Sequence, residues 1–110
     1  LMRNTDRPQD LAEARDWLRK AAAQSHAPAA WELGRALEFG VGGELDRKDA
    51  VDQYRLAASQ DHPAAMQRLQ RAYREGELGE APNASLANFW GLKLKLAAAA
   101  AKKTPTPAGR

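Results

Sequence analysis

The sequence repeats itself at an interval of 36 residues, and no gap is needed to keep the two copies in register. The matched pairs are Asp10/Asp46, Ala14/Ala50, Arg19/Arg55, Ala21/Ala57, Ala22/Ala58, His26/His62, Ala29/Ala65, Leu33/Leu69, Ala36/Ala72 and Gly40/Gly76. A fixed period of this size indicates a stack of supersecondary units, each too small to bury its own apolar face. We therefore expect a solenoid, a class of fold that usually works through an extended binding surface.

Composition narrows the class further. The 110 residues are the length of one domain, and alanine, a strong helix former, dominates. There is no cysteine, which excludes disulfides, thiolate zinc sites and cysteine nucleophiles but is compatible with either the cytoplasm or the periplasm. No signal peptide is recognisable, and no apolar run approaches the ~20 residues of a membrane span. Because the chain begins at Leu1, we expect a fragment of a longer protein, with residues 1–9 a remnant of a preceding repeat.

Periodicity and punctuation predict an all-α repeat domain of about five helices over residues 10–103, followed by a disordered tail at 104–110. Gly40 and Gly76 are expected to end the second and fourth helices. The last helix is expected to run to about Lys103. The residues expected to cap the five helix N-termini are Asp10, Ser25, Asp46, Asp61 and Asn83.

The first four helices each carry a stripe of apolar residues at helical spacing, which should face the core. The fourth helix, with Tyr73 on its apolar side, needs a neighbour, so the last helix should close the stack. The expected stripes are Leu11, Ala14, Leu18, Ala21 and Ala22; Ala29, Leu33, Ala36 and Leu37; Ala50, Tyr54, Ala57 and Ala58; and Ala65, Leu69, Ala72 and Tyr73.

Residues 17–34, WLRKAAAQSHAPAAWELG, resemble the Sel1-like repeat, whose pattern runs approximately W-Y-x-K-A-A-x-x-G-x-x-x-A-x-x-x-L-G. Residues 53–69 resemble it again, with Asp61 at the small turn residue and Gln70 at the final glycine. A third, eroded copy follows, as in a terminal capping repeat. The resemblance implies a right-handed α/α superhelix, related to tetratricopeptide arrays, that serves as an adaptor or scaffold for protein–protein contacts. It implies no catalytic residue.

In the architecture that this resemblance implies, the second and fourth helices line the inner, concave wall. The helical step places Trp31, Arg35 and Glu38 together, opposite the apolar stripe. Their equivalents one repeat later are Gln67, Arg71 and Arg74. Trp and Arg anchor interfaces most often, so these six residues are the candidate partner-binding strip. Alternatively, Trp31 packs between repeats and the arginines form ordinary surface ion pairs.

No residue pattern in the sequence indicates a catalytic, metal-binding or cofactor-binding site. His26 and His62 are the two histidines, and nothing at metal-ligand spacing accompanies them, so we expect structural roles and no metal or cofactor. No catalytic constellation or phosphate loop is present, so a small-molecule substrate is not expected. Asn83-Ala84-Ser85 reads as a glycosylation sequon, but a helix cap is the favoured reading.

The last helix is apolar on nearly all sides, so one side should contact something beyond the fourth helix. A further repeat, another domain and self-association with a second copy are all compatible with this pattern. The 36-residue register places Trp90 where Tyr54 lies one repeat earlier. The segment from residue 81 onward also carries Lys93, Lys95, Lys102, Lys103 and Arg110 and no acidic residue. A peripheral module that touches anionic lipid or nucleic acid through this helix is therefore the alternative function, though a less favoured one.

Overall fold

The computed structural model describes residues 8–103 and consists of helices and connecting loops over that range. The expected remnant at Leu1 and Met2 and the expected disordered tail at 104–110 lie outside the described residues. No described helix has both the length and the apolar composition that crossing a bilayer requires. The all-α prediction is confirmed. The helices are α1 (Pro8–Ala23), α2 (Ala27–Phe39), α3 (Arg47–Ala58), α4 (Pro63–Glu75) and α5 (Ala84–Lys103).

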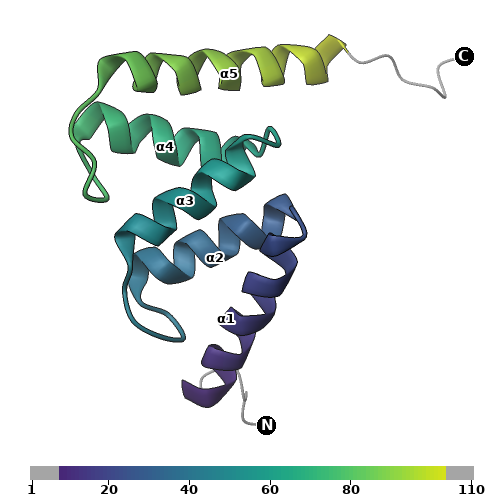
Figure 1. Ribbon diagram of the computed structural model, residues 1–110. Helices are drawn as coiled ribbons and strands as arrows, with labels where there is room; N and C mark the ends of the chain where they lie inside the picture. The colour runs from purple at the N-terminus through teal and green to yellow at the C-terminus, as the bar shows by residue number, and fades with distance from the viewer. Residues whose placement is uncertain (1–7, 104–110) are drawn as a thin grey trace, which may run out of the picture.

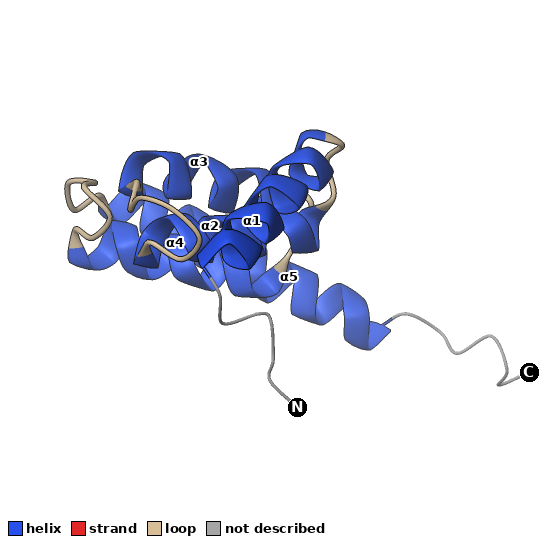
Figure 2. Cartoon of the chain, turned by 90° about the horizontal axis from the view of Figure 1, so that it is seen from below, coloured by secondary structure: helices blue, strands red, loops and turns tan. Residues whose placement is uncertain are grey.

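The helices stack in chain order, from α1 at one end to α5 at the other (Figure 1). The principal packing contacts join α1 to α2, α2 to α3, α3 to α4 and α4 to α5. Figure 2 looks at the stack from below, so the helices overlap, with loops joining one helix to the next. Packing mainly between elements that are close along the chain is typical of a solenoid. α5 packs along α4, and the expectation that it closes the stack stays a prediction.

The 36-residue period is visible in the backbone. Shifting α2 by 36 residues gives the bounds of α4. Gly40 and Gly76 both adopt the left-handed conformation, with φ of 69° and 74°, and both end their helices as predicted. A residue without Cβ enters this region at no steric cost, which is why glycine stands at both positions.

Two of the predicted N-caps are confirmed by their hydrogen bonds. The Asp46 carboxylate accepts a bond from the backbone N–H of Asp49 at 3.0 Å. The Asn83 side-chain oxygen accepts one from the N–H of Leu86, also at 3.0 Å. Each side chain satisfies a backbone donor that has no partner within its helix.

The other three predicted caps are wrong. Ser25 and Asp61 lie in the left-handed region, with φ of 64° and 63°, and the following histidines occupy the N-cap positions of α2 and α4. Short polar side chains tolerate this conformation better than most. The Nδ1 of His62 accepts a bond from the N–H of Ala65 at 3.4 Å. Asp10 lies in the first turn of α1, because this helix begins at Pro8.

The stripes predicted for α2, α3 and α4 are all buried, together with Val51 and Met66, which the prediction omitted. The α1 stripe is only partly correct. Ala22 is buried, Leu11, Leu18 and Ala21 are half-buried, and Ala14 is exposed. Within the described residues α1 packs chiefly on α2, so its other side has no helix against it.

A large residue faces a glycine at equivalent positions in both repeats, with the partners exchanged. At Gly34 of α2, an added Cβ would lie 2.6 Å from Cε1 of Tyr54 on α3. One repeat later Gln70 takes the place of Gly34. The residue of α5 that faces it is Gly91, whose Cβ would lie 2.5 Å from Nε2 of Gln70. The chain thus fills the same inter-helix space from α3 in one repeat and from α4 in the next.

This exchange corrects the expectation that Trp90 occupies the position of Tyr54. Asn83 caps α5 37 residues after Asp46 caps α3, so the second loop is one residue longer. The register between α3 and α5 is therefore 37, and Gly91 lies at the position of Tyr54. Trp90 is half-buried against the core and meets Phe89 edge to face at 4.9 Å between ring centroids.

The outer side of α5 carries an uncovered apolar row, Phe89, Leu92 and Leu96. Its inner side, which includes Ala87 and Gly91, is buried. The apolar character on both sides agrees with the sequence analysis. That a neighbour covers this outer row stays a prediction, and a second copy of the chain is one of the compatible neighbours.

Gly34→Ala should destabilise the protein by about 1–3 kcal/mol, because the rigid, fully buried ring of Tyr54 cannot move out of the way. Gly91→Ala is the matched control. Its clash involves the end of a flexible Gln70 side chain, so the gain in helix propensity, up to about 1 kcal/mol, should make it neutral or stabilising. Urea unfolding checks both, and equal losses would contradict the exchange.

Candidate functional site

The residues predicted to bind a partner meet in an open hollow of about 430 Å³ between α2 and α4. Of the predicted strip, Trp31, Gln67, Arg71 and Arg74 line it. Arg68, which the sequence analysis missed, lies among them. We call this surface the α2–α4 hollow. Its lining residues are Trp31, Ala64, Gln67, Arg68, Gln70, Arg71 and Arg74.

Trp31 forms the aromatic wall of the hollow and is also tied to the core. Its ring centroid lies 5.3 Å from that of Tyr54 and 5.6 Å from that of His62, with which it is stacked. It is half-buried. Trp31 therefore packs between the repeats, as the alternative reading predicts, and it also lines the hollow. Its role in binding a partner stays a prediction.

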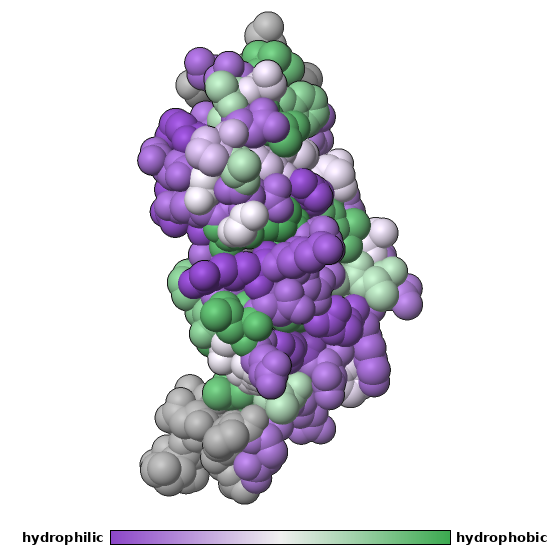
Figure 3. Space-filling view, turned by 60° about the vertical axis from the view of Figure 1, so that its left-hand side comes forward, coloured by the Kyte–Doolittle hydropathy of each residue, from purple (hydrophilic) through white to green (hydrophobic). Residues whose placement is uncertain are grey.

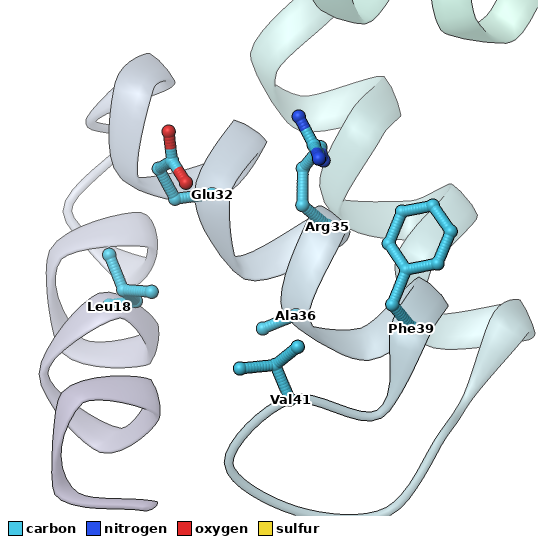
Figure 4. A pocket seen from close by; sticks show the side chains of 6 residues that line it. All are labelled: Leu18, Glu32, Arg35, Ala36, Phe39 and Val41. Carbon is cyan, nitrogen blue, oxygen red and sulfur yellow. The ribbon is translucent and has the colours of Figure 1, made fainter. Parts of the chain in front are cut away.

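Arg35 lies outside the α2–α4 hollow. Its guanidinium carbon is 5.6 Å from the ring centroids of both Trp31 and Phe39, so the cation is held between two aromatic faces of its own helix. It lines a separate hollow of about 290 Å³ with Leu18, Glu32, Ala36, Phe39 and Val41 (Figure 4).

Glu38 is not on the exposed strip, contrary to expectation. It is only 8% exposed, and its carboxylate is saturated with donors. Arg68 reaches it with two bonds, from Nε to Oε1 at 3.1 Å and between Nη2 and Oε2 at 2.6 Å. The hydroxyl of Tyr54 donates to Oε1 at 2.7 Å. A buried carboxylate needs such partners, because leaving it unpaired costs several kcal/mol.

The network continues from Arg68 to the loop after α4. Nη1 of Arg68 donates to Oε1 of Glu77 at 2.7 Å, and Nε of Arg71 donates to the same oxygen at 2.9 Å. Burial works to raise the pKa of Glu38, but the bonds from Arg68 and Tyr54 outweigh it and leave the pKa below its ordinary value. The bonds from Arg68 and then Arg71 lower the pKa of Glu77.

Arg71 and Arg74 are the exposed cations of the hollow. Their side chains are 55% and 57% exposed, whereas that of Arg68 is 10% exposed. Arg74 donates to Glu75 at 3.2 Å. These are surface ion pairs of the ordinary kind that the sequence analysis held as the alternative, so each contributes little to stability.

The basic C-terminal helix offers less than the hollow. Lys93 lies 4.0 Å from Asp61, and Lys95 is exposed. The side chains of Lys102 and Lys103 lie outside the description. Figure 3 brings forward the side that carries the α2–α3 and α4–α5 loops, where hydrophilic residues cover much of the middle and hydrophobic residues show between them.

Comparison with known proteins supports a Sel1-like repeat assignment. No protein-family model and no curated protein matches the sequence. The fold matches the crystal structure of a Sel1 repeat protein from Oxalobacter formigenes, with 34% sequence identity and a TM-score of 0.67. This chain is built of Sel1-like repeats. The match covers 78% of this chain and 63% of that protein, so the chain corresponds to less than two thirds of its relative.

Arg68→Met should lower the free energy of unfolding by about 3–5 kcal/mol, because it leaves Glu38 buried without its cation. Arg71→Met, on the same helix, should cost about 0–1 kcal/mol. Replacing both partners, Glu38→Met with Arg68→Met, should recover most of the loss. Urea unfolding monitored by circular dichroism tests the series, and equal effects of the two arginine variants would contradict the network.

Acidification should destabilise the protein below pH 4.5, which is the ordinary pKa of a glutamate side chain. The pKa values of Glu38 and Glu77 are lowered in the folded state, so their contribution is complete above pH 4.5 and is lost as the pH falls through the folded values. Glu38→Gln should make the unfolding midpoint lower at pH 7 and less dependent on pH below 4.5. An unchanged slope in this variant would contradict the assignment.

Proposed function

We propose that this chain is a non-enzymatic protein–protein interaction module whose partner lies along the α2–α4 hollow. The observation that carries the proposal is the convergence of Trp31, Gln67, Arg71 and Arg74 on one hollow. These residues come from two helices at equivalent places in successive repeats. Solenoids bind partners along such extended surfaces, which agrees with the Sel1-like architecture.

The chemistry of the hollow suits a protein partner. Trp31 offers a large aromatic surface that is already held in place by Tyr54 and His62. Little side-chain entropy is lost when a partner covers it, because the ring is ordered beforehand. Arg71 and Arg74 offer exposed guanidinium groups, which provide directional donors. Aromatic and arginine side chains of this kind carry most of the energy in protein interfaces.

The function can be tested by capture of partners from a lysate of the source cell on the immobilised protein. Arg71→Ser with Arg74→Ser should abolish capture, because both exposed cations of the hollow are lost. Lys48→Ser with Lys95→Ser removes the same charge from exposed positions on α3 and α5 and should leave capture intact. Helicity and melting temperature should stay nearly unchanged in both.

Trp31 is not a suitable first test, because it also packs on Tyr54 and a loss of stability would confuse the result. Capture by the arginine variant at the wild-type level would contradict the proposal. Binding that instead depends on Lys95 and weakens steeply with salt would favour the contact of α5 with anionic lipid or nucleic acid.

A further inference from the structure

Glu77 is held by two arginines through one of its carboxylate oxygens. Both Arg68 and Arg71 donate to a single oxygen, Oε1, of a partly exposed side chain in the loop after α4. Glu77 is the first residue after the C-cap glycine, and its backbone is held independently, by a bond from its N–H to the carbonyl of Ala72 at 2.8 Å. The carboxylate can therefore rotate away without disturbing the fold.

The arginine pair that holds this carboxylate is pre-arranged. Arg68 is fixed by its two bonds to the buried Glu38, so its Nη1 points toward Glu77 whether or not a carboxylate is there. Arg71 stands one turn along the same helix face and is half exposed. A pair of guanidinium groups held this way matches an oxygen anion better than a flexible pair does, because less ordering accompanies binding.

The surroundings favour an anion attached to a peptide. The lining of the α2–α4 hollow includes three arginines, two glutamines, an alanine and a tryptophan, and no acidic side chain. The adjoining hollow, also of about 430 Å³, shares Arg68 and Arg71 and adds Arg47. Its two carboxylates are those of Glu38 and Glu77, which these shared arginines already bind. Trp31 and Ala64 supply an apolar wall beside these charges. Glutamine amides can donate to and accept from a peptide backbone.

We propose that the α2–α4 hollow binds an acidic segment of the partner, one of whose carboxylates displaces Glu77 from Arg68 and Arg71. Glu77 then acts as an internal stand-in that occupies the arginines when no partner is bound. The proposal rests on the proposed function and specifies the chemistry of the partner. An incoming carboxylate exchanges one pair of charge-assisted bonds for an equivalent pair, so Glu77 weakens binding by competition.

The test uses a fluorescein-labelled ten-residue peptide that alternates Glu and Leu, measured by fluorescence anisotropy. The acidic peptide should bind, and a peptide with Gln in place of every Glu should bind at least about tenfold more weakly. Arg71→Ser with Arg74→Ser should weaken binding of the acidic peptide by a similar factor. Glu77→Gln should tighten it by about threefold or more, because the competing charge is removed.

Glu80→Gln is the matched control, since it removes one charge from the same loop but lies beside Arg55 rather than the hollow. It should change the affinity by less than about twofold. Thermal unfolding checks that both glutamine variants are folded, and Glu77→Ala repeats the test if one is not. The proposal is overturned if Glu77→Gln binds the acidic peptide no better than the wild type, or if both peptides bind equally.

A single-stranded oligonucleotide of equal charge is a further arm, and equal binding of it would also overturn the preference for a peptide. If the peptide experiment fails, the capture experiment still shows whether the proposed function fails with it. If capture from the lysate still depends on Arg71 and Arg74, the hollow binds a partner of different chemistry. If capture does not depend on them, the proposed function fails as well.

Discussion

Glu38 joins the two repeats through a carboxylate that is almost out of contact with water. Its partners come from both of the following helices, since Tyr54 lies on α3 and Arg68 on α4. A charge in this position is stable only when every donor is in place, so the three helices must keep one relative arrangement. Apolar residues of the same volume could serve stability equally well. What the pair adds is position, because the fork of Arg68 can meet the carboxylate in few orientations.

The arrangement of charged groups on the surface depends on where this buried pair holds Arg68. Arg68 forms part of the lining of the α2–α4 hollow, and its remaining nitrogen determines where Glu77 lies. Arg71 donates to the same carboxylate oxygen of Glu77. The interior therefore sets the pattern of charge that an approaching protein meets. Trp31 likewise contributes to both the interior and the surface, because its ring packs on Tyr54 and the residue also lines the hollow.

Local signals in the sequence were enough to predict the helices and much of the core. Glycine at 40 and 76, and Asp46 and Asn83 at helix starts, act through their own backbone neighbourhood, so a single sequence reveals them. Ser25 and Asp61 adopt the left-handed conformation, and their assignment as caps is wrong because serine and aspartate are also common N-cap residues. A signal for the correct reading was present, since the Sel1-like pattern places a glycine at this position.

The remaining errors concern contacts between residues far apart in the chain. The burial of Glu38 depends on Arg68, 30 residues away, and the helical step alone cannot reveal such a partner. Of the six-residue strip, Trp31, Gln67, Arg71 and Arg74 line one hollow, and their role in binding a partner stays a prediction. Trp90 was assigned to the position of Tyr54 because the added loop residue was overlooked. The spacing of 37 between Asp46 and Asn83 recorded that residue in the sequence itself.

The exchange between Gly34 facing Tyr54 and Gln70 facing Gly91 bears on how such an array can lengthen or shorten. A duplicated unit that set Gln70 against a tyrosine would bring two large side chains into one space. A unit that set Gly34 against Gly91 would leave that space empty. A break between Gly34 and Tyr54, or between Gln70 and Gly91, separates a facing pair. A break in the turn between α1 and α2, or in the turn between α3 and α4, keeps each pair together. The unit that keeps its packing when moved is therefore the second helix of one repeat together with the first helix of the next. This unit is offset by one helix from the repeat that the sequence displays.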